Sequence, residues 1–402
     1  MTRILISAYS CGPGEGSEPG AGYALVQAAS GVGPCWVLTR GNNVEELESA
    51  LTARPPAHPV TVVGVDGPDW TVALKRRFGA VRLYYALWQR VVAREASRLE
   101  RVTGGFDIVH HATMSAFWLP IGVSRLGRPL VIGPVSGGTF TPLSLVRYLG
   151  WRGFAADAVR YVAARLGAWR TRRSFRRASV VIAQNREMER FARRRLVTDG
   201  ERLIRHSHAS DPEVETPSSV TEGREPTVLF VGRLVTWKGV LLAIDAFAAA
   251  RLDTARLVVI GRGPALDAMR ARAEERGVAN RVEFTGLLER TEVLRRMRSA
   301  SCLLFPSFHD SAGFVVSEAL SLGLPVVCLD HGGPGELVRL WETESRAVAP
   351  GPAGATVRRL AEAIADFVDS PRPVPDELVR SNSSLADLVR DAYGRALGGT
   401  RP

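Results

Sequence analysis

Apolar strand-like runs alternate with longer helix-like segments in both halves of the chain, and this alternation restricts the fold more than any other feature. Segments repeated in this order bury their apolar faces as parallel sheets covered by helices. In the first half we expect strands at 3–9, 35–40, 60–65, 107–112, 129–135 and 179–185. The helices between them are expected at 20–30, 71–101 and 147–177.

The second half restarts the same alternation after residues 206–226, which lose periodicity and gather Pro, Ser and Glu as interdomain connections do. Its strands are expected at 227–234, 255–261, 281–286, 301–307 and 324–330. Its helices are expected from 240, at 264–277, 291–299 and 313–322, and near 334–340.

A chain of 402 residues is also too long for one ordinary core. We therefore predict two Rossmann-like, doubly wound α/β domains that face each other across a cleft. We expect the first to span 1–207 and the second to span 208–377. A helix at about 378–402 is expected to pack back on the first domain.

Charge and hydropathy narrow the class of protein. The net charge of +11 favours acidic partners such as phosphates or an anionic membrane face. Apolar runs are broken by Gly and Pro and fall short of the roughly 20 residues that span a membrane. Because the N-terminal apolar segment is too short for a signal peptide, we expect a cytoplasmic protein, peripheral at most at the inner membrane face.

Arginine is densest at 147–177, where aromatic residues are interleaved with it. The ordinary interpretation is a helix with a solvated face. The alternative is a helix that docks on a membrane surface or on the acceptor. The segment carries no nucleic-acid-binding motif, so nucleic acid is not an expected partner.

The four cysteines (Cys11, Cys35, Cys302 and Cys328) stand singly, without the C-x-x-C spacing of a metal or redox site. Buried, reduced thiols are the expectation, and no zinc-type cluster is expected.

Lys238 stands out because Lys75 is the only other lysine and all the remaining basic residues are arginine. It follows a strand-like run and precedes a helix that starts near Gly239. Helix N-termini bind anions, and Arg233 and Lys238 would bracket this one with two positive charges. Arginine can grip two phosphate oxygens and lysine is a compact point charge, so the pair suits a diphosphate. An exposed basic pair at a helix start is the alternative.

Two neighbouring strand ends offer backbone to a ligand. Gly261 and Gly263 allow close approach, although G-x-G also forms plain tight turns. Leu287 and Leu288 could edge a nucleobase, or belong to an ordinary loop.

The segment 309–327 gives the strongest signal. Asp310 lies on a loop and Glu318 within the following helix, where a carboxylate can accept hydrogen bonds from ribose or sugar hydroxyls. The backbone amides of Ala312, Gly313 and Phe314 are expected to meet a phosphate or sugar hydroxyl. Helix capping is an alternative for Asp310. Capping does not explain Glu318, because a buried, unpartnered carboxylate is costly.

The loops of the first half are expected to complete the site. In the Gly-rich loop 11–24 we select Gly16, Ser17, Glu18 and Gly20 for the donor phosphates or the reacting sugar, with a flexible surface loop as the alternative.

Further along the first half, the candidates are His110 and His111 at one strand end, and Gly137 and Gly138 after the next. A histidine at a strand end can also be an ordinary, satisfied loop residue.

These motifs occur in the order and spacing of a known family. "GRLVTWKG", "GRGP", "FTG" and "DSAGFVVSEA" resemble the retaining glycosyltransferases of the GT-B fold, the glycogen-synthase-like and mannosyltransferase-like family named glycosyl transferases group 1. The family includes many bacterial mannosyl-, glucosyl- and N-acetylglucosaminyl-transferases. The resemblance covers nearly the whole chain and is strongest from 228 to 338.

The resemblance implies that the first domain (1–207) binds the acceptor and the second (208–377) binds the donor. It makes His110, His111, Gly137 and Gly138 acceptor-side candidates.

The resemblance also implies roles for the residues that match the motifs. Arg233 and Lys238 match the residues that bind the donor diphosphate. In the family's Glu–seven residues–Glu pattern, the first acid contacts the donor sugar and the second holds the nucleotide ribose. Asp310 and Glu318 occupy these places, with Asp where the family usually has Glu and "DSAGF" in place of the common "EGFGL".

A family histidine that touches the donor sugar or reaction centre matches the doublet His110–His111, of which we favour His111. The predicted catalytic residues are Asp310, His111, Glu318, Lys238 and Arg233.

The resemblance implies transfer of a hexose from a nucleoside diphosphate sugar, UDP- or GDP-linked, to an acceptor hydroxyl with retention of configuration. The acceptor can be a sugar, a lipid-linked sugar or a small natural product. Two fixed cations would replace a metal ion, so no metal or other cofactor is expected.

Three alternatives remain at this stage: another sugar-nucleotide enzyme such as an epimerase or phosphorylase, an inactive nucleotide-sugar-binding partner, and a nicotinamide oxidoreductase. The last lacks a clean G-x-G-x-x-G.

Overall fold

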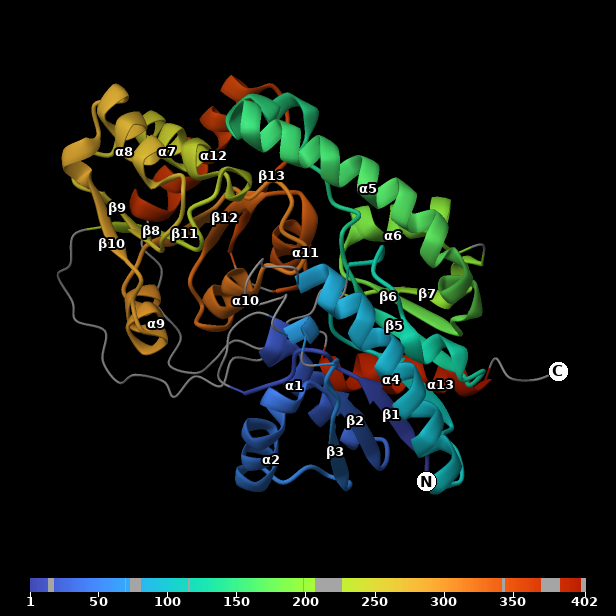
Figure 1. Cartoon of the computed structure of the whole chain (residues 1–402). Helices are drawn as coiled ribbons and strands as arrows, with labels where there is room; N and C mark the ends of the chain where they lie inside the picture. Colours follow the sequence, from blue (N-terminus) through green and yellow to red (C-terminus); the bar gives the residue numbers. More distant parts are fainter. Residues whose placement is uncertain are drawn as a thin grey trace. The chain divides into compact units, whose positions relative to one another are not determined.

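The computed structural model describes residues 1–13, 18–68, 70–72, 81–114, 116–197, 199–206, 226–341, 344–369 and 384–398 (Figure 1). The chain divides into two compact units. The first comprises Met1–Gly138, Val162–Ser210 and Ser383–Pro402, and the second comprises Thr139–Tyr161 and Asp211–Asn382. Residues 139–161, which the sequence assigns to the first half, group with the second unit, so the division falls inside one long helix.

The first unit is built on a parallel sheet with the strand order β3-β2-β1-β4-β5-β6-β7. The strands are β1 (Ile4–Ser7), β2 (Cys35–Thr39), β3 (Val60–Gly64), β4 (Ile108–His111), β5 (Leu130–Val135), β6 (Val180–Ala183) and β7 (Leu203–Arg205). The helices are α1 (Glu18–Ser30), α2 (Val44–Ala53), α4 (Val81–Thr103), α5 (Gly150–Arg177), α6 (Arg186–Arg195) and α13 (Leu385–Gly398).

The second unit has its own parallel sheet, with the order β10-β9-β8-β11-β12-β13. The strands are β8 (Thr227–Val231), β9 (Arg256–Ile260), β10 (Val282–Gly286), β11 (Cys302–Phe305), β12 (Val326–Leu329) and β13 (Arg346–Val348). The helices are α7 (Val240–Ala249), α8 (Leu266–Glu275), α9 (Arg290–Arg298), α10 (Phe314–Ser321), α11 (Gly332–Leu340) and α12 (Ala353–Asp369).

Two Rossmann-like α/β units were predicted from the alternation, and the two helix-covered parallel sheets confirm them. Every strand expected from an apolar run is present, because such runs are buried on both faces of a parallel sheet. The sequence analysis missed α2, α6, β7, β13 and α12. In α12, buried Leu360, Ile364 and Phe367 have the i, i+4, i+7 spacing of a helix face, so its pattern was available.

Strand order determines where loops meet. In the first sheet β1 lies between β2 and β4, and in the second β8 lies between β9 and β11. At such a switch point the connections on either side leave in opposite directions, and ligands bind beyond the carboxyl ends of the strands. The loops after β1 and β4, and those after β8 and β11, are therefore the natural ligand-binding loops of the two units.

The C-terminal helix α13 belongs to the core of the first unit. Leu388, Val389, Ala392 and Tyr393 are buried in one apolar cluster with residues of β1, α1 and β4. The predicted domain boundaries at 207 and 377 fall outside the described residues and stay a prediction.

All four cysteines are buried free thiols, as expected, and burial raises the pKa of each to about 12. No helix in the described part of the chain is long and apolar enough to cross a membrane.

Candidate active site

Lys238 lies at the switch point of the second sheet. It ends a short 3-10 turn, Thr236–Lys238, that leads from β8 into α7. Its ammonium donates to the Asp310 carboxylate on the loop after β11, and the two side chains are only 16% and 14% exposed. The same nitrogen lies 4.8 Å from the Trp237 ring centre and 4.7 Å from that of Phe305. Ion pairing and the two π faces hold the charge in one place.

Gly239 is what brings the Lys238 loop so close to β11. Its backbone is left-handed, with φ 72°, and a Cβ at this position would collide with the carbonyl oxygen of Pro306. A glycine is required on both counts.

Asp310 accepts hydrogen bonds from the first amides of α10 as well as from Lys238. Its Oδ1 is 2.9 Å from the Gly313 nitrogen and 3.3 Å from the Ala312 nitrogen. Burial alone would raise the pKa of the carboxyl, but Lys238 and the two amides outweigh it and hold the pKa below its usual value. Asp310 is therefore ionised, and it occupies the amides of Ala312 and Gly313 that the sequence analysis offered to a ligand. Phe314 begins the helix directly after them.

Glu318 has a partner within the protein that the sequence analysis did not identify. On α10, its Oε1 is 3.0 Å from a guanidinium nitrogen of Arg290, the first residue of α9. Burial raises the pKa of the carboxyl and Arg290 opposes the rise. Arg290 was missed because the two residues are distant in sequence, and no local pattern marks it.

Trp237 and His309 also belong to the site and were missed. Their rings stack at 4.6 Å with an angle of 18° between the planes, so the residue before Lys238 rests on the residue before Asp310. His309 Nε2 is 3.7 Å from Asp157 of α5, which is itself paired with Arg160 at 2.7 Å. Burial lowers the pKa of His309 to about 4. Their neighbours Lys238 and Asp310 were the only available sequence signal.

Arg233 is exposed in the same loop that carries Lys238. Gly261 and Gly263 follow β9, and side chains there would collide with the carbonyl oxygens of Gly232 and Leu234. The two glycines therefore let the loops after β8 and β9 pack together, and a ligand role for them stays a prediction. Leu287 and Leu288 follow β10, and Leu287 is among the exposed apolar side chains.

In the first unit, Gly16 and Ser17 lie outside the described residues. Glu18 begins α1, and its carboxylate accepts from the backbone amide of Met114 at 2.5 Å. Met114 follows β4 and has a left-handed φ of 56°. The structure thus joins the loop after β1 to the loop after His111. Gly20 lies in the first turn of α1, at intermediate exposure.

The two histidines of β4 differ sharply. His110 is fully buried and both ring nitrogens are bonded, Nδ1 with the Tyr393 hydroxyl at 2.9 Å and Nε2 with the Gly133 carbonyl at 2.8 Å. Burial lowers the pKa of His110 to about 4. It is a core residue that ties α13 to the sheet.

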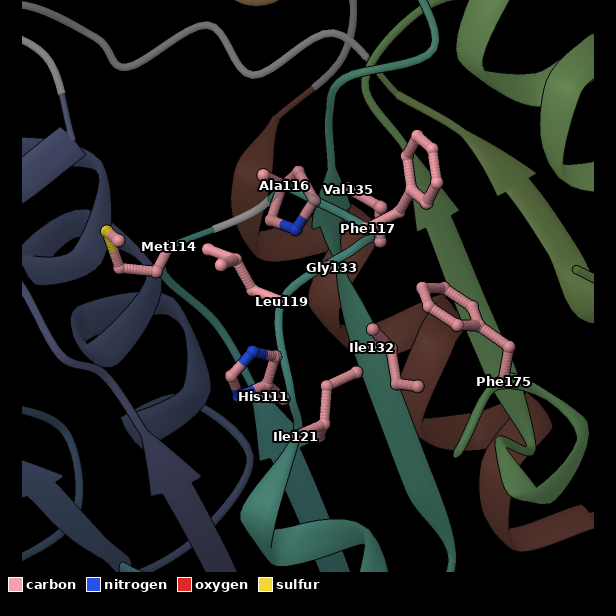
Figure 2. A pocket seen from close by; sticks show the side chains of 11 residues that line it. His111, Met114, Ala116, Phe117, Leu119, Ile121, Ile132, Gly133, Val135 and Phe175 are labelled. Carbon is pink, nitrogen blue, oxygen red and sulfur yellow. The ribbon is translucent and has the colours of Figure 1, made fainter. Parts of the chain in front are cut away.

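His111 points into a small pocket whose other lining side chains are apolar (Figure 2). Its Nε2 is 3.2 Å from the Tyr85 hydroxyl, and its buried Nδ1 has no partner among the described residues. Burial, with a smaller contribution from His110, lowers the pKa of His111 to about 3, so the ring is neutral. Of the doublet, His111 is thus the one with a free ring nitrogen.

Gly137 and Gly138 are buried. A Cβ on Gly137 would collide with the ring of Trp118, and one on Gly138 would press on Met188. These glycines allow close packing inside the first unit, and their acceptor-side role stays a prediction.

The chain is similar to known glycosyltransferases. Residues 213–381 match the family described as glycosyl transferases group 1. The chain is 30% identical over 339 residues to 2-deoxystreptamine glucosyltransferase of Streptomyces kanamyceticus, which covers 81% of this chain and 78% of that protein.

Among solved structures, sucrose-phosphate synthase from Thermosynechococcus elongatus aligns over 100% of both chains with a TM-score of 0.61 and 16% identity. The Anabaena protein HepE in complex with UDP-glucose aligns over 99% of this chain and 100% of its own, with a TM-score of 0.54 and 16% identity.

These neighbours share two Rossmann-like units and confirm the predicted GT-B fold. Enzymatic sugar transfer, rather than oxidoreduction or inactive binding, is what the relatives have in common. The chain belongs to the glycosyl transferases group 1 family, and it is a glycosyltransferase.

Proposed function

We propose that the chain transfers a hexose from a nucleoside diphosphate sugar to an acceptor hydroxyl, with retention at the anomeric carbon and without a metal ion. The observation that carries this proposal is the placement of Lys238 and Arg233 on the loop after β8, at the switch point of the second sheet. Two cations at a switch point suit the diphosphate of a donor.

The chemistry follows from where charge develops. The bond between the anomeric carbon and the phosphate oxygen breaks, which leaves a cationic sugar and an anionic nucleoside diphosphate. Lys238 and Arg233 stabilise the leaving anion, an electrostatic role that costs little reorganisation when the cations are already in place. The acceptor oxygen bonds to the anomeric carbon and its proton passes to the leaving phosphate oxygen.

Asp310 orients Lys238 and accepts hydrogen bonds from donor-sugar hydroxyls. Ionised at neutral pH, it remains an acceptor for both. Glu318 accepts from the ribose hydroxyls, and the Arg290 ion pair opposes the rise in the pKa of this carboxyl that burial causes.

UDP is the first nucleotide to test, because HepE, which has the same fold, was solved with UDP-glucose. The first acceptor to test is 2-deoxystreptamine, because the name of the relative from Streptomyces kanamyceticus contains this compound. Natural-product and carbohydrate acceptors both fit the proposal.

The purified chain should be incubated with UDP-glucose, UDP-N-acetylglucosamine or GDP-mannose, with and without acceptor, and nucleotide release followed. We expect release from a UDP-sugar that accelerates with acceptor, and a product whose anomeric configuration by NMR matches that of the donor. A chelator should leave the rate unchanged.

Three outcomes would count against parts of the proposal. An inverted product contradicts retention, and activity lost to chelator but restored by Mg²⁺ contradicts metal independence. Cleavage that requires free phosphate would indicate a phosphorylase.

A further inference from the structure

Helix α5 buries and exposes the opposite residue types to an ordinary surface helix. The residues that it buries are mostly small: Ala164, Gly167, Ala168, Thr171 and Phe175. Its large apolar side chains lie on the outside: Trp151, Phe154, Val159, Val162, Leu166 and Trp169. The two tryptophans are 77% and 78% exposed. Surface helices normally turn large apolar residues to the core and polar residues to water.

The exposed residues lie on one side of the helix. Trp151 and Trp169 are separated by about five full helical turns, and Phe154, Val162 and Leu166 lie within about 60° of the line that joins them, so the residues form one broad stripe. The stripe is about 27 Å long at 1.5 Å per residue. Figure 1 draws α5 as one unbroken helix. A contiguous apolar surface of this kind marks an interaction site.

Packing prevents the helix from turning this stripe inward. A Cβ on Gly167 would collide with Cβ of Trp118, so the inner face of α5 lies directly against its neighbour. The large side chains cannot replace Gly167 and Ala164 in that contact. Their exposure is a consequence of how the helix is packed.

The exposed charged residues that α5 itself carries are all arginines. Exposed arginines flank it and follow it at the C-terminal end: Arg152, Arg170, Arg172, Arg173, Arg176 and Arg177. The single acid of α5, Asp157, is held by Arg160 and by the amide of Thr141. The outer face therefore combines apolar and aromatic residues with arginines and no carboxylate.

We propose that this outer face of α5 docks on an anionic lipid bilayer, with the stripe in the interface and the arginines on the lipid head groups. Tryptophan favours the boundary between head groups and acyl chains, and long arginine side chains reach the phosphates from a helix lying in the plane. The net charge of +11 adds a long-range attraction to such a surface.

A second copy of the chain is a poorer occupant for this face. Paired outer faces would oppose arginine to arginine without an acid on either side. Nucleic acid would satisfy the arginines but leave Val162 and Leu166 without an apolar partner.

Vesicle co-sedimentation tests the proposal without any sugar substrate, so the result is independent of the proposed reaction. The full chain should bind vesicles of phosphatidylcholine mixed with phosphatidylglycerol and bind pure phosphatidylcholine weakly. High salt should weaken the binding. Trp151→Ser/Trp169→Ser should reduce it by about tenfold or more, because the variant loses its two largest interfacial side chains.

Trp70→Ser provides the matched control, since Trp70 is 62% exposed outside α5. It should bind as the unaltered chain does. Arg172→Gln/Arg173→Gln/Arg176→Gln should abolish the preference for anionic lipid.

A single label locates the contact. The four native thiols are buried, so Leu166→Cys can be labelled selectively with an environment-sensitive dye. Its emission should shift to the blue much more with anionic vesicles than with pure phosphatidylcholine. Equal binding to neutral vesicles, or unimpaired binding of Trp151→Ser/Trp169→Ser, would overturn the proposal. Dimerisation that depends on Trp151 and Trp169, without vesicle binding, would overturn it in favour of a protein interface.

Discussion

The two units handle charge at their strand ends in opposite ways. In the second, Lys238 pairs with Asp310 and Arg290 pairs with Glu318, at side chains that keep some contact with solvent. In the first, His110 and His111 are buried, and burial holds the pKa of both far below its usual value.

This difference indicates separate roles for the two units in the reaction. A leaving diphosphate needs fixed cations that a ligand can reach, and Lys238 satisfies that condition. A neutral imidazole such as His111 can accept or donate a hydrogen bond but cannot neutralise charge. We therefore expect electrostatic catalysis to depend on the second unit, and the first unit to contribute neutral groups and stability.

Lys238→Ala should have the largest effect of these variants on turnover. Removal of a preorganised charge from the leaving group should lower kcat by about 10²- to 10³-fold. Steady-state release of nucleotide from the donor measures the effect.

Loss of Lys238 also leaves Asp310 without its counter-ion, which can cost about 3 kcal/mol of stability. Lys238→Met/Asp310→Asn removes both charges, so it should melt close to the unaltered chain and remain inactive. Near-normal turnover of this double variant would show that the pair has no role in transfer.

Glu318→Gln should weaken nucleotide binding by about tenfold, the value of one hydrogen bond to a charged group. Calorimetric titration with the nucleoside diphosphate measures the affinity. Arg290→Gln is the companion variant: it leaves Glu318 buried without a partner and should further raise the pKa of that carboxyl. If Glu318→Gln binds nucleotide normally, the carboxylate does not contact the ribose.

His309→Ala tests whether the ring stack in the second unit positions the Lys238 and Asp310 loops. The Trp237–His309 stack joins the Lys238 loop to the Asp310 loop, and such pairs are worth about 0.5–1.5 kcal/mol. We expect kcat to fall about two- to tenfold. His309→Phe keeps the stack and should restore most of the rate. A phenylalanine variant as slow as the alanine variant would contradict a positioning role.

Acidification should give the smallest effect. His110 and His111 have folded-state pKa values of about 4 and 3 against an ordinary 6.5, so between about pH 6.5 and 4 the unfolded chain binds more protons. Stability should therefore fall as pH drops through this window.

The thermal midpoint of unfolding, measured from pH 7 to pH 4.5, should fall less steeply in His110→Gln/His111→Gln. His58→Gln, at a half-buried histidine, is the control. An unchanged slope in the double variant would mean that His110 and His111 are not the source.

The sequence predicted the site unevenly, for physical reasons. Lys238, Asp310 and Glu318 could be selected because loops after apolar strands and before helices are visible in local patterns. The partner of Glu318 could not, because Arg290 begins a different helix and approaches only when α9 and α10 fold together. The choice between His110 and His111 was likewise open, since adjacent residues of a buried strand look alike.

Local periodicity and motif spacing by themselves determined the two parallel sheets, the loops at their switch points and the membership of a glycosyltransferase family. Only the tertiary structure decided which groups meet: Tyr393 with His110, Asp310 with Lys238, and Gly167 with Trp118. The last contact also decided that α5 turns its tryptophans outward. A strand or helix is encoded by neighbours in sequence, whereas an ion pair, a buried imidazole or an exposed apolar stripe depends on segments that are distant in the chain and close only in the fold.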